Sequence, residues 1–166
     1  ARAPFFTEQD EKRLLYELSQ MSNPNHLRLT KLALMTGFRR SELLSLNWRN
    51  IDLKNNRLHI QRKECAARGS SSSMRMVPLP HKAKELLKSF KSKEGSVINL
   101  TKGSARNGFD RARKKAGLEN LRFHDLRHIA ISRMWSSGMN ALEISACSGH
   151  RDIKMLMRYS HYQLSF

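Results

Sequence analysis

The sequence is poor in cysteine and has no long apolar run. Its two cysteines, Cys65 and Cys147, lie far apart and form no metal-ligand spacing, so neither a disulfide framework nor a zinc module is expected. No apolar stretch approaches the roughly 20 residues that a membrane-spanning helix needs, and the N-terminus lacks the apolar segment of a signal peptide. These absences favour a chain of the reducing cytoplasm with no membrane partner.

Acidic side chains are also scarce. Lysine and arginine number 31 against 14 aspartates and glutamates, which gives a net charge of +17. The excess is concentrated in residues 82–115, where eleven basic side chains face three acidic ones. A surplus of this size exceeds what solubility requires and indicates a polyanionic partner, for which nucleic acid fits better than a membrane. Affinity for such a partner should fall steeply with salt, because binding releases counterions.

The hydrophobic periodicity predicts one domain, mixed α+β and predominantly helical, with a small three-stranded antiparallel sheet. A chain of 166 residues is long enough to bury one core. Strands are expected at Ile51–Leu53, Leu58–Ile60 and Met74–Val77, with Asn55 and Asn56 in the first turn and a mobile, serine-rich loop at 65–73. Helices are expected from Thr7 past Met21, at 26–35, 41–48, 81–93, 104–116 and 123–135, after Asn140, and after Asp152.

Several side chains have expected environments within these elements. His26 should lie on the surface, Tyr16 in the core or at its rim, and His59 in solvent on its strand. The helix at 104–116 should pack its apolar face while its basic side chains project: Arg106, Arg111, Arg113, Lys114 and Lys115. Such a projecting stripe supports contacts to a nucleic-acid backbone.

Four short motifs occur in a fixed order along the chain. The first is Thr36-Gly37-Phe38-Arg39-Arg40-Ser41-Glu42-Leu43, the second His124-Asp125-Leu126-Arg127-His128, the third Gly149-His150, and the last Tyr159, nine residues after His150. None is specific alone, but together in this order they resemble the catalytic domain of the tyrosine recombinases, the family of phage integrases, transposon integrases and chromosome-dimer resolvases. The resemblance runs from about Thr7 to the end.

This resemblance implies a site-specific DNA recombinase that cleaves and rejoins strands through a 3′-phosphotyrosyl intermediate. It implies a metal-independent enzyme without a cofactor, from a phage or other mobile element. It also implies a tetramer on two double-stranded DNA sites, with possible accessory DNA-bending proteins. Relatives carry an N-terminal DNA-clamping domain, so residues 1–166 are expected to be the single catalytic domain of a longer protein. A lysine on the hairpin should reach the site; Lys63 fits, with Arg62 as its competitor.

The residue types suit this chemistry on their own terms. Two arginines can hold the non-bridging oxygens of a phosphodiester and stabilise the charge of its transition state, which we assign to Arg39 and Arg127. His150 can donate a further hydrogen bond to the same oxygens. His124 is the candidate acceptor of the nucleophile's proton, and Lys63 the candidate acid for the leaving 5′ oxygen.

Two further assignments complete the expected site. Glu42 should orient the groups that touch the phosphate. Tyr159 is the expected nucleophile because Tyr16 precedes the whole cationic set, while Tyr162, one turn later, is the alternative. Ser148 stands before Gly149 where the family often has leucine, a difference expected to affect only local packing.

Three rival functions are compatible with parts of the sequence. A metal-dependent nuclease could use His124 and His128, one helical turn apart, with Asp125; it lacks an evident third ligand at matching geometry. A DNA-binding module without catalysis would bind and form no covalent adduct. A DNA-relaxing topoisomerase would use an overlapping set of residues.

Overall fold

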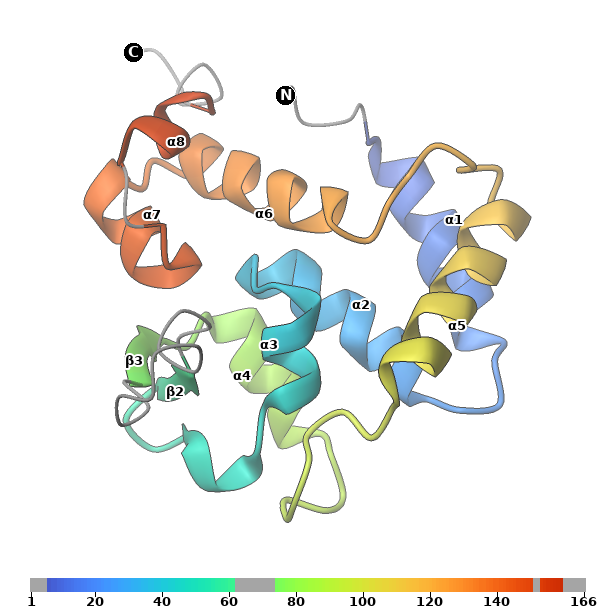
Figure 1. Ribbon diagram of the computed structural model, residues 1–166, viewed down its shortest axis with the longest axis horizontal. Coiled ribbons are helices and arrows are strands. Elements are labelled where there is room, and N and C mark those ends of the chain that lie inside the picture. Colours follow the sequence, from blue (N-terminus) through green and yellow to red (C-terminus); the bar gives the residue numbers. More distant parts are fainter. Residues whose placement is uncertain (1–5, 62–73, 151–152, 160–166) are drawn as a thin grey trace.

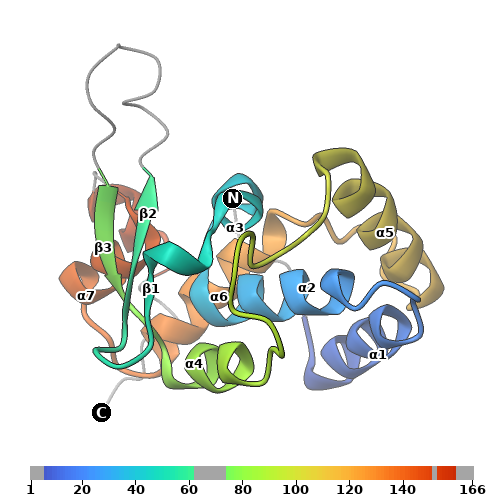
Figure 2. The ribbon, with the colours of Figure 1, turned by 90° about the horizontal axis from the view of Figure 1, so that it is seen from below.

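Two helices lie side by side and run in the same direction through the middle of the molecule, and the other elements pack around them. A computed structural model describes residues 6–61, 74–150 and 153–159. The central pair is α2 (Asn25–Thr36) and α6 (Asp125–Ser136), which make the most extensive contact between helices. A sheet lies at one end of this pair, and α1 (Glu8–Ser19) and α5 (Lys102–Lys115) lie side by side at the other (Figures 1 and 2).

The remaining elements surround the sheet end of the central pair. They are α3 (Arg40–Ser45), a 3₁₀ turn (Trp48–Asn50), β1 (Ile51–Asp52), β2 (Arg57–Gln61), β3 (Met74–Pro78), α4 (His81–Lys88), α7 (Ala141–Ser148) and α8 (Ile153–Met157). The strands form one antiparallel sheet in the order β1-β2-β3, with Ile51 opposite Leu58 and Leu58 opposite Val77. The prediction of a mostly helical domain with a three-stranded antiparallel sheet is confirmed.

Local sequence signals explain where several helices begin and end. The Thr7 side chain accepts from the Asp10 amide, and the Asp10 carboxylate accepts from Thr7, which closes a capping box at the start of α1. Gly37 ends α2 at φ 71° and Gly149 ends α7 at φ 76°, in the left-handed region that favours glycine. Asn56 takes φ 55° in the β1–β2 turn, as an asparagine can.

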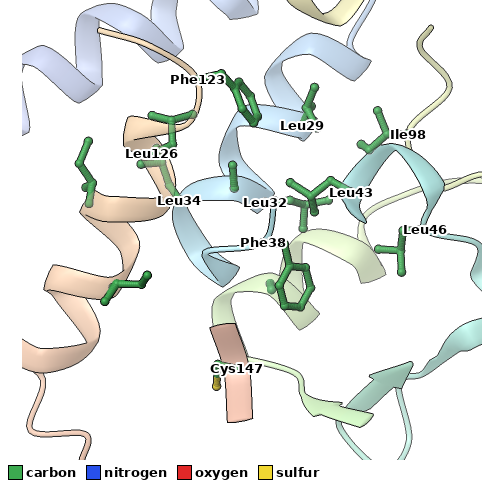
Figure 3. Packing of buried hydrophobic residues seen from close by; sticks show 14 of the residues in the cluster. Leu29, Leu32, Leu34, Phe38, Leu43, Leu46, Ile98, Phe123, Leu126 and Cys147 are labelled. Carbon is green, nitrogen blue, oxygen red and sulfur yellow. The ribbon is translucent and has the colours of Figure 1, made fainter. Parts of the chain in front are cut away.

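The core lies between α2, α3, α6 and the 3₁₀-to-sheet segment. Figure 3 shows Leu32, Leu43 and Leu126 converging on it, and each is at most 1% exposed. Phe38, also 1% exposed, is the first residue after the Gly37 turn. Because Arg39 follows a buried phenylalanine directly, this turn fixes its backbone against the core. No helix among the described residues is long and apolar enough to cross a bilayer.

Some local predictions were wrong. His26 is buried because it faces Gly108 of α5, where the missing side chain leaves room for the imidazole. Tyr16 is 60% exposed rather than in the core or at its rim. The helix expected through Trp48 ends at Ser45, and the one expected to reach Lys93 ends at Lys88.

Other expectations within these elements are confirmed or corrected by exposure. His59 is exposed on β2, as predicted. Four of the five projecting side chains on α5 are exposed, whereas Arg113 is half-buried and donates to Asp110 at 3.0 Å. The loop at 65–73 lies outside the described residues, so the prediction of its mobility is untested.

Candidate active site

Arg127 occupies the middle of the candidate site. Its side chain leaves α6 one turn after His124 and is 3% exposed. It donates from Nη1 to the Gly37 carbonyl at 2.8 Å and from Nη2 to the Ser148 carbonyl at 2.9 Å. One guanidinium therefore joins the helix ends that precede Arg39 and His150. Burial, followed by the charge of Arg39, lowers the pKa of Arg127 to about 10, so it stays cationic at neutral pH.

Arg39 and Glu42 are arranged by the start of α3. Arg39 is the N-cap residue, and its backbone amide donates to Oε1 of Glu42 at 2.9 Å. The same oxygen lies 3.8 Å from Nη1 of Arg39, whose side chain is 39% exposed. A buried carboxylate thus holds both the backbone and the head group of a guanidinium that still reaches solvent. This arrangement agrees with the expected orienting role of Glu42.

Arg75 is a residue that the sequence analysis missed. It lies on β3, and its Nη1 is 2.5 Å from Oε2 of Glu42, with both side chains at most 10% exposed. Its Nη2 also donates to the carbonyl of Cys147 at 3.4 Å, near the C-terminus of α7. A Cβ at Gly149 would lie 2.7 Å from the Arg75 guanidinium carbon, so glycine is required there. Arg75 therefore joins the sheet to both α3 and the turn before His150.

His150 follows the left-handed Gly149 turn, which directs its imidazole toward Arg127. Nη2 of Arg127 lies 3.3 Å from its Nδ1 and 3.5 Å from its Nε2, and Oγ of Ser148 lies 2.7 Å from Nδ1. Partial burial, then the charges of Arg127 and Arg39, lower the pKa of His150 to about 4. The imidazole is therefore neutral at physiological pH and can donate one ring hydrogen without adding a charge.

Two more imidazoles lie on the same face of α6. The rings of His124 and His128 meet edge to face, with centroids 4.9 Å apart. Burial is the largest cause that lowers the pKa of both imidazoles. Nearby positive charge lowers it further: the charges of Arg127 and Arg39 act on His124, and the charge of His124 acts on His128. Both are therefore poised as neutral proton acceptors.

Tyr159 packs back onto α6 just after α8. It is 4% exposed, and its hydroxyl is hydrogen-bonded to Nδ1 of His128, whose ring stacks on it with centroids 5.7 Å apart. The Trp135 indole, which donates to the Leu156 carbonyl at 3.1 Å, anchors α8 to α6. From the sequence, His128 was expected only as the last residue of the second motif and as a possible partner of His124 in a metal pair, not as a partner of Tyr159. Nothing in helical spacing distinguishes His128 from His124, because both share one face.

A hollow next to Arg39 could receive an anion. It measures about 600 Å³ and is lined by the following residues: Arg39, Arg40, Ser41, Leu44, Ser45, Lys102 and His124. Three basic side chains and an imidazole thus border one space at the edge of the site. Such a wall can bind the oxygens of a phosphodiester, and a backbone could continue from it past the positive N-terminal part of α5.

The structure brings together most of the residues that the sequence singled out. Arg127 lies next to His150, Glu42 next to Arg39, and His124 next to the imidazole that holds Tyr159. Arg39 acts on the pKa values of both His124 and His150. Lys63, its competitor Arg62 and the alternative nucleophile Tyr162 lie outside the described residues.

The residues of the proposed metal pair are engaged otherwise. Asp125 is 6% exposed, and its carboxylate accepts from the Arg122 amide at 2.7 Å and lies 3.6 Å from the Arg122 guanidinium. Among residues 6–61, 74–150 and 153–159, no group of three or more histidine, cysteine or carboxylate side chains could hold a metal ion. The described part of the chain therefore offers no candidate metal centre.

Comparisons with known proteins identify the family to which the sequence is similar. The model of the phage integrase family matches residues 4–165. The Shufflon-specific DNA recombinase of Escherichia coli is 38% identical over 132 residues, which cover 78% of this chain and 33% of that protein. The chain therefore spans about a third of the length of this relative.

Two solved structures extend the comparison to the fold. The catalytic domain of bacteriophage HP1 integrase superposes with a TM-score of 0.78 at 29% identity, covering 98% of this chain and 89% of that one. The XerH site-specific recombinase bound to its difH substrate gives a TM-score of 0.68 at 20% identity, covering 96% and 50%. The fold is that of the HP1 integrase catalytic domain.

Proposed function

The chain belongs to the phage integrase family, and we propose that it is the catalytic domain of a site-specific DNA recombinase. The observation that carries this proposal is the arrangement of Arg127 and His150 within one cluster whose imidazoles also hold Tyr159. A phenol placed beside imidazoles and guanidiniums suits attack on a phosphodiester better than binding alone. We propose Tyr159 as the nucleophile and double-stranded DNA as the substrate.

The proposed reaction exchanges one phosphoester bond for another. The Tyr159 oxygen attacks phosphorus while the bond from phosphorus to the 5′ oxygen breaks, leaving a 3′-phosphotyrosyl linkage and a 5′-hydroxyl. The tyrosine proton passes to an imidazole, and the leaving oxygen takes a proton from Lys63. Because the number of phosphoester bonds is unchanged, the strand can be rejoined without ATP and without a metal ion.

The cations supply the stabilisation that this attack needs. Arg39 and Arg127 would contact the non-bridging oxygens, with His150 as a neutral donor and Glu42 holding Arg39 in place. Removing one such contact should lower the cleavage rate about 10²–10³-fold. His124 was the acceptor expected from the sequence, but the contact of His128 with the Tyr159 hydroxyl makes His128 a second candidate.

The distribution of charge supports the proposed partner. Basic side chains are exposed along α5, and α4 adds Lys82 and Lys88. These would contact the DNA backbone, so the logarithm of the affinity should fall linearly with the logarithm of salt concentration. The Tn1549 transposon integrase, which shares this fold, is named in its structure as in complex with transposon right end DNA. We place the activity in the cytoplasm, at the nucleoid.

We also propose that active complexes are tetramers on two DNA sites. The apolar side chains of Ile153, Met155 and Met157 on α8 are each at least 40% exposed. Because these residues immediately precede Tyr159, the binding of a neighbouring protomer to them would be coupled to the position of the proposed nucleophile. Crosslinking with and without paired-site DNA tests this: tetramers should appear only with DNA.

Trapping of the covalent intermediate tests the function directly. The chain is incubated in EDTA with a nicked duplex that carries the element's junction sequence, so that cleavage releases a short strand and cannot be reversed. We expect an adduct with the wild type and with Tyr162→Phe, and none with Tyr159→Phe. An adduct lost only in Tyr162→Phe would move the nucleophile. An adduct that requires added Mg²⁺ would favour metal-dependent cleavage.

Two alternatives are separated by the same assay. DNA that shifts in a gel but never becomes covalently attached to any variant would indicate a binding module. Supercoiled plasmid that is relaxed without any junction sequence would indicate a topoisomerase. Arg127→Lys serves as the matched control for the guanidinium. It keeps the positive charge at this position while losing the bidentate hydrogen bonding of arginine.

A further inference from the structure

The hydroxyl of Ser148 contacts the imidazole of His150 from a buried position. Ser148 is 0% exposed, and its Oγ lies 2.7 Å from Nδ1 of His150. The backbone amide of His150 also points at this Oγ, at 3.4 Å. The left-handed turn at Gly149 makes the contact possible, because it folds residue 150 back over residue 148. Ser148 therefore does more than fill space in front of the glycine.

The direction of the hydrogen bonds follows from the groups around Nδ1. A guanidinium can only donate, and Nη2 of Arg127 lies closer to Nδ1 than to Nε2. The His150 amide can only donate as well, which makes Oγ of Ser148 an acceptor toward it and leaves the hydroxyl hydrogen for the ring. Both neighbours can therefore donate to Nδ1. This arrangement favours the neutral imidazole with its proton on Nε2.

We propose that Ser148 is a positioning residue that holds His150 in the tautomer with hydrogen on Nε2. The consequence for catalysis rests on the proposed function. Only this tautomer can offer an Nε2–H donor to a non-bridging phosphate oxygen while the imidazole remains uncharged. Without the hydroxyl, the ring could place its hydrogen on Nδ1, and its outer nitrogen would then repel an anionic oxygen.

A second serine provides the matched control. Ser145, on the same helix, donates to the backbone carbonyl of His150 at 2.7 Å, whereas the ring nitrogens of His150 are contacted by Arg127 and Ser148. Ser145 therefore holds the backbone of His150 without contacting Nδ1 of its ring. Ser148→Ala and Ser145→Ala each delete one hydroxyl near His150, but only the first removes a partner of the imidazole.

Nitrogen-15 NMR of the histidine side chains measures the tautomer directly in the whole chain without DNA. The His150 signals are assigned by their loss in His150→Gln, at a pH of about 7.5, and thermal melting confirms that each variant is folded. We expect wild type and Ser145→Ala to carry hydrogen on Nε2, and Ser148→Ala to shift toward the Nδ1–H form or a mixture. A wild type with hydrogen on Nδ1, or a Ser148→Ala variant identical to wild type, would overturn the inference.

Adduct formation then measures the consequence. We expect Ser148→Ala to lower the cleavage rate about tenfold, the effect of one neutral hydrogen bond, with unchanged DNA affinity. A normal rate in a variant whose tautomer has changed would overturn the catalytic part of the inference. If wild type forms no adduct at all, the proposed function fails, while the NMR result still decides the tautomer. The two failures are therefore distinguishable.

Discussion

The Nδ1 atom of His128 and the hydroxyl of Tyr159 are hydrogen-bonded across α6 and the segment that follows α8. The two rings also stack, at an interplanar angle of 26°. Tyr159 is thus held inside its own protomer, against the residue next to Arg127. Because the pKa of His128 is lowered, its neutral Nδ1 can accept the phenolic hydrogen. The proposed nucleophile therefore lies beside a candidate base.

His128→Phe should therefore slow cleavage while keeping the aromatic packing against Tyr159. We expect a loss of about 10²-fold, the lower end of general base catalysis, with DNA affinity unchanged. The loss should shrink as the pH approaches about 10, where a tyrosine ionises without help. Single-turnover adduct formation across this pH range is the measurement. A deficit that stays constant with pH would mean that His128 only orients the ring.

Comparison with His124 separates the two candidate bases. The ring of His124 packs on the ring of His128, whereas the tyrosine hydroxyl is hydrogen-bonded to His128. If His124 takes the proton in the DNA complex, His124→Phe should show the pH-dependent deficit and His128→Phe should not. A deficit in both variants would indicate a relay through the two imidazoles.

Arg75 and Glu42 form a buried ion pair whose halves should depend on each other. Arg75→Met leaves the Glu42 carboxylate buried without its closest cation, which should cost about 3 kcal/mol of unfolding free energy. Adding Glu42→Gln should recover much of this loss. Urea denaturation of the two single variants and the double variant gives the coupling. Additive losses in the double variant would mean that the pair does not act as a unit.

The sequence singled out residues that the structure brings together, but not the residues that support them. Arg39, Arg127, His150 and Tyr159 could be proposed from the sequence because the order of their motifs can be read without coordinates. Arg75 was missed since nothing local marks a strand arginine whose partner is 33 residues away in α3. The family resemblance likewise marked Ser148 only as a packing difference, because the leucine that is frequent there makes no hydrogen bond to a histidine ring.

The predicted ends of helices were wrong where tertiary contacts compete with local helix preference. The helix expected through Trp48 stops at Ser45 because Leu46 and Trp48 enter extended contacts instead: the Trp48 amide donates to the Gly95 carbonyl, and the Val97 amide to the Leu46 carbonyl. His26 was predicted to lie on the surface because it stands in a polar first turn. Its local sequence does not reveal that a glycine on another helix, Gly108, leaves room for its ring. Such pairings become visible only once the chain is folded.

The packing of His26 against Gly108 should be detectable in a stability experiment. Alanine is ordinarily about 1 kcal/mol better than glycine inside a helix. At position 108, however, an added Cβ would overlap the His26 ring. Gly108→Ala should therefore destabilise the protein, and His26→Ala should reverse the sign of the change at 108. Thermal melts of the two single variants and the double variant test this; a stabilising Gly108→Ala on its own would contradict the packing.

Acid should destabilise this protein through the imidazoles of the site. Folding lowers the pKa of His124, His128 and His150, the last to about 4, from an ordinary value near 6.5. Between these limits the unfolded chain binds more protons than the folded one, so unfolding free energy rises with pH and is lost as pH falls.

Urea denaturation between pH 7.5 and 4.5 should show this decline in unfolding free energy, and His150→Gln should make it shallower. Asp10 and Asp52, whose pKa values are lowered below 3.8, titrate mainly beneath this window. Burial also lowers the pKa of His26, so His26 contributes to the decline in every variant and His150→Gln removes only part of it. A slope that His150→Gln leaves unchanged would show that this imidazole is protonated as easily in the folded site as in water, contrary to its burial beside Arg127.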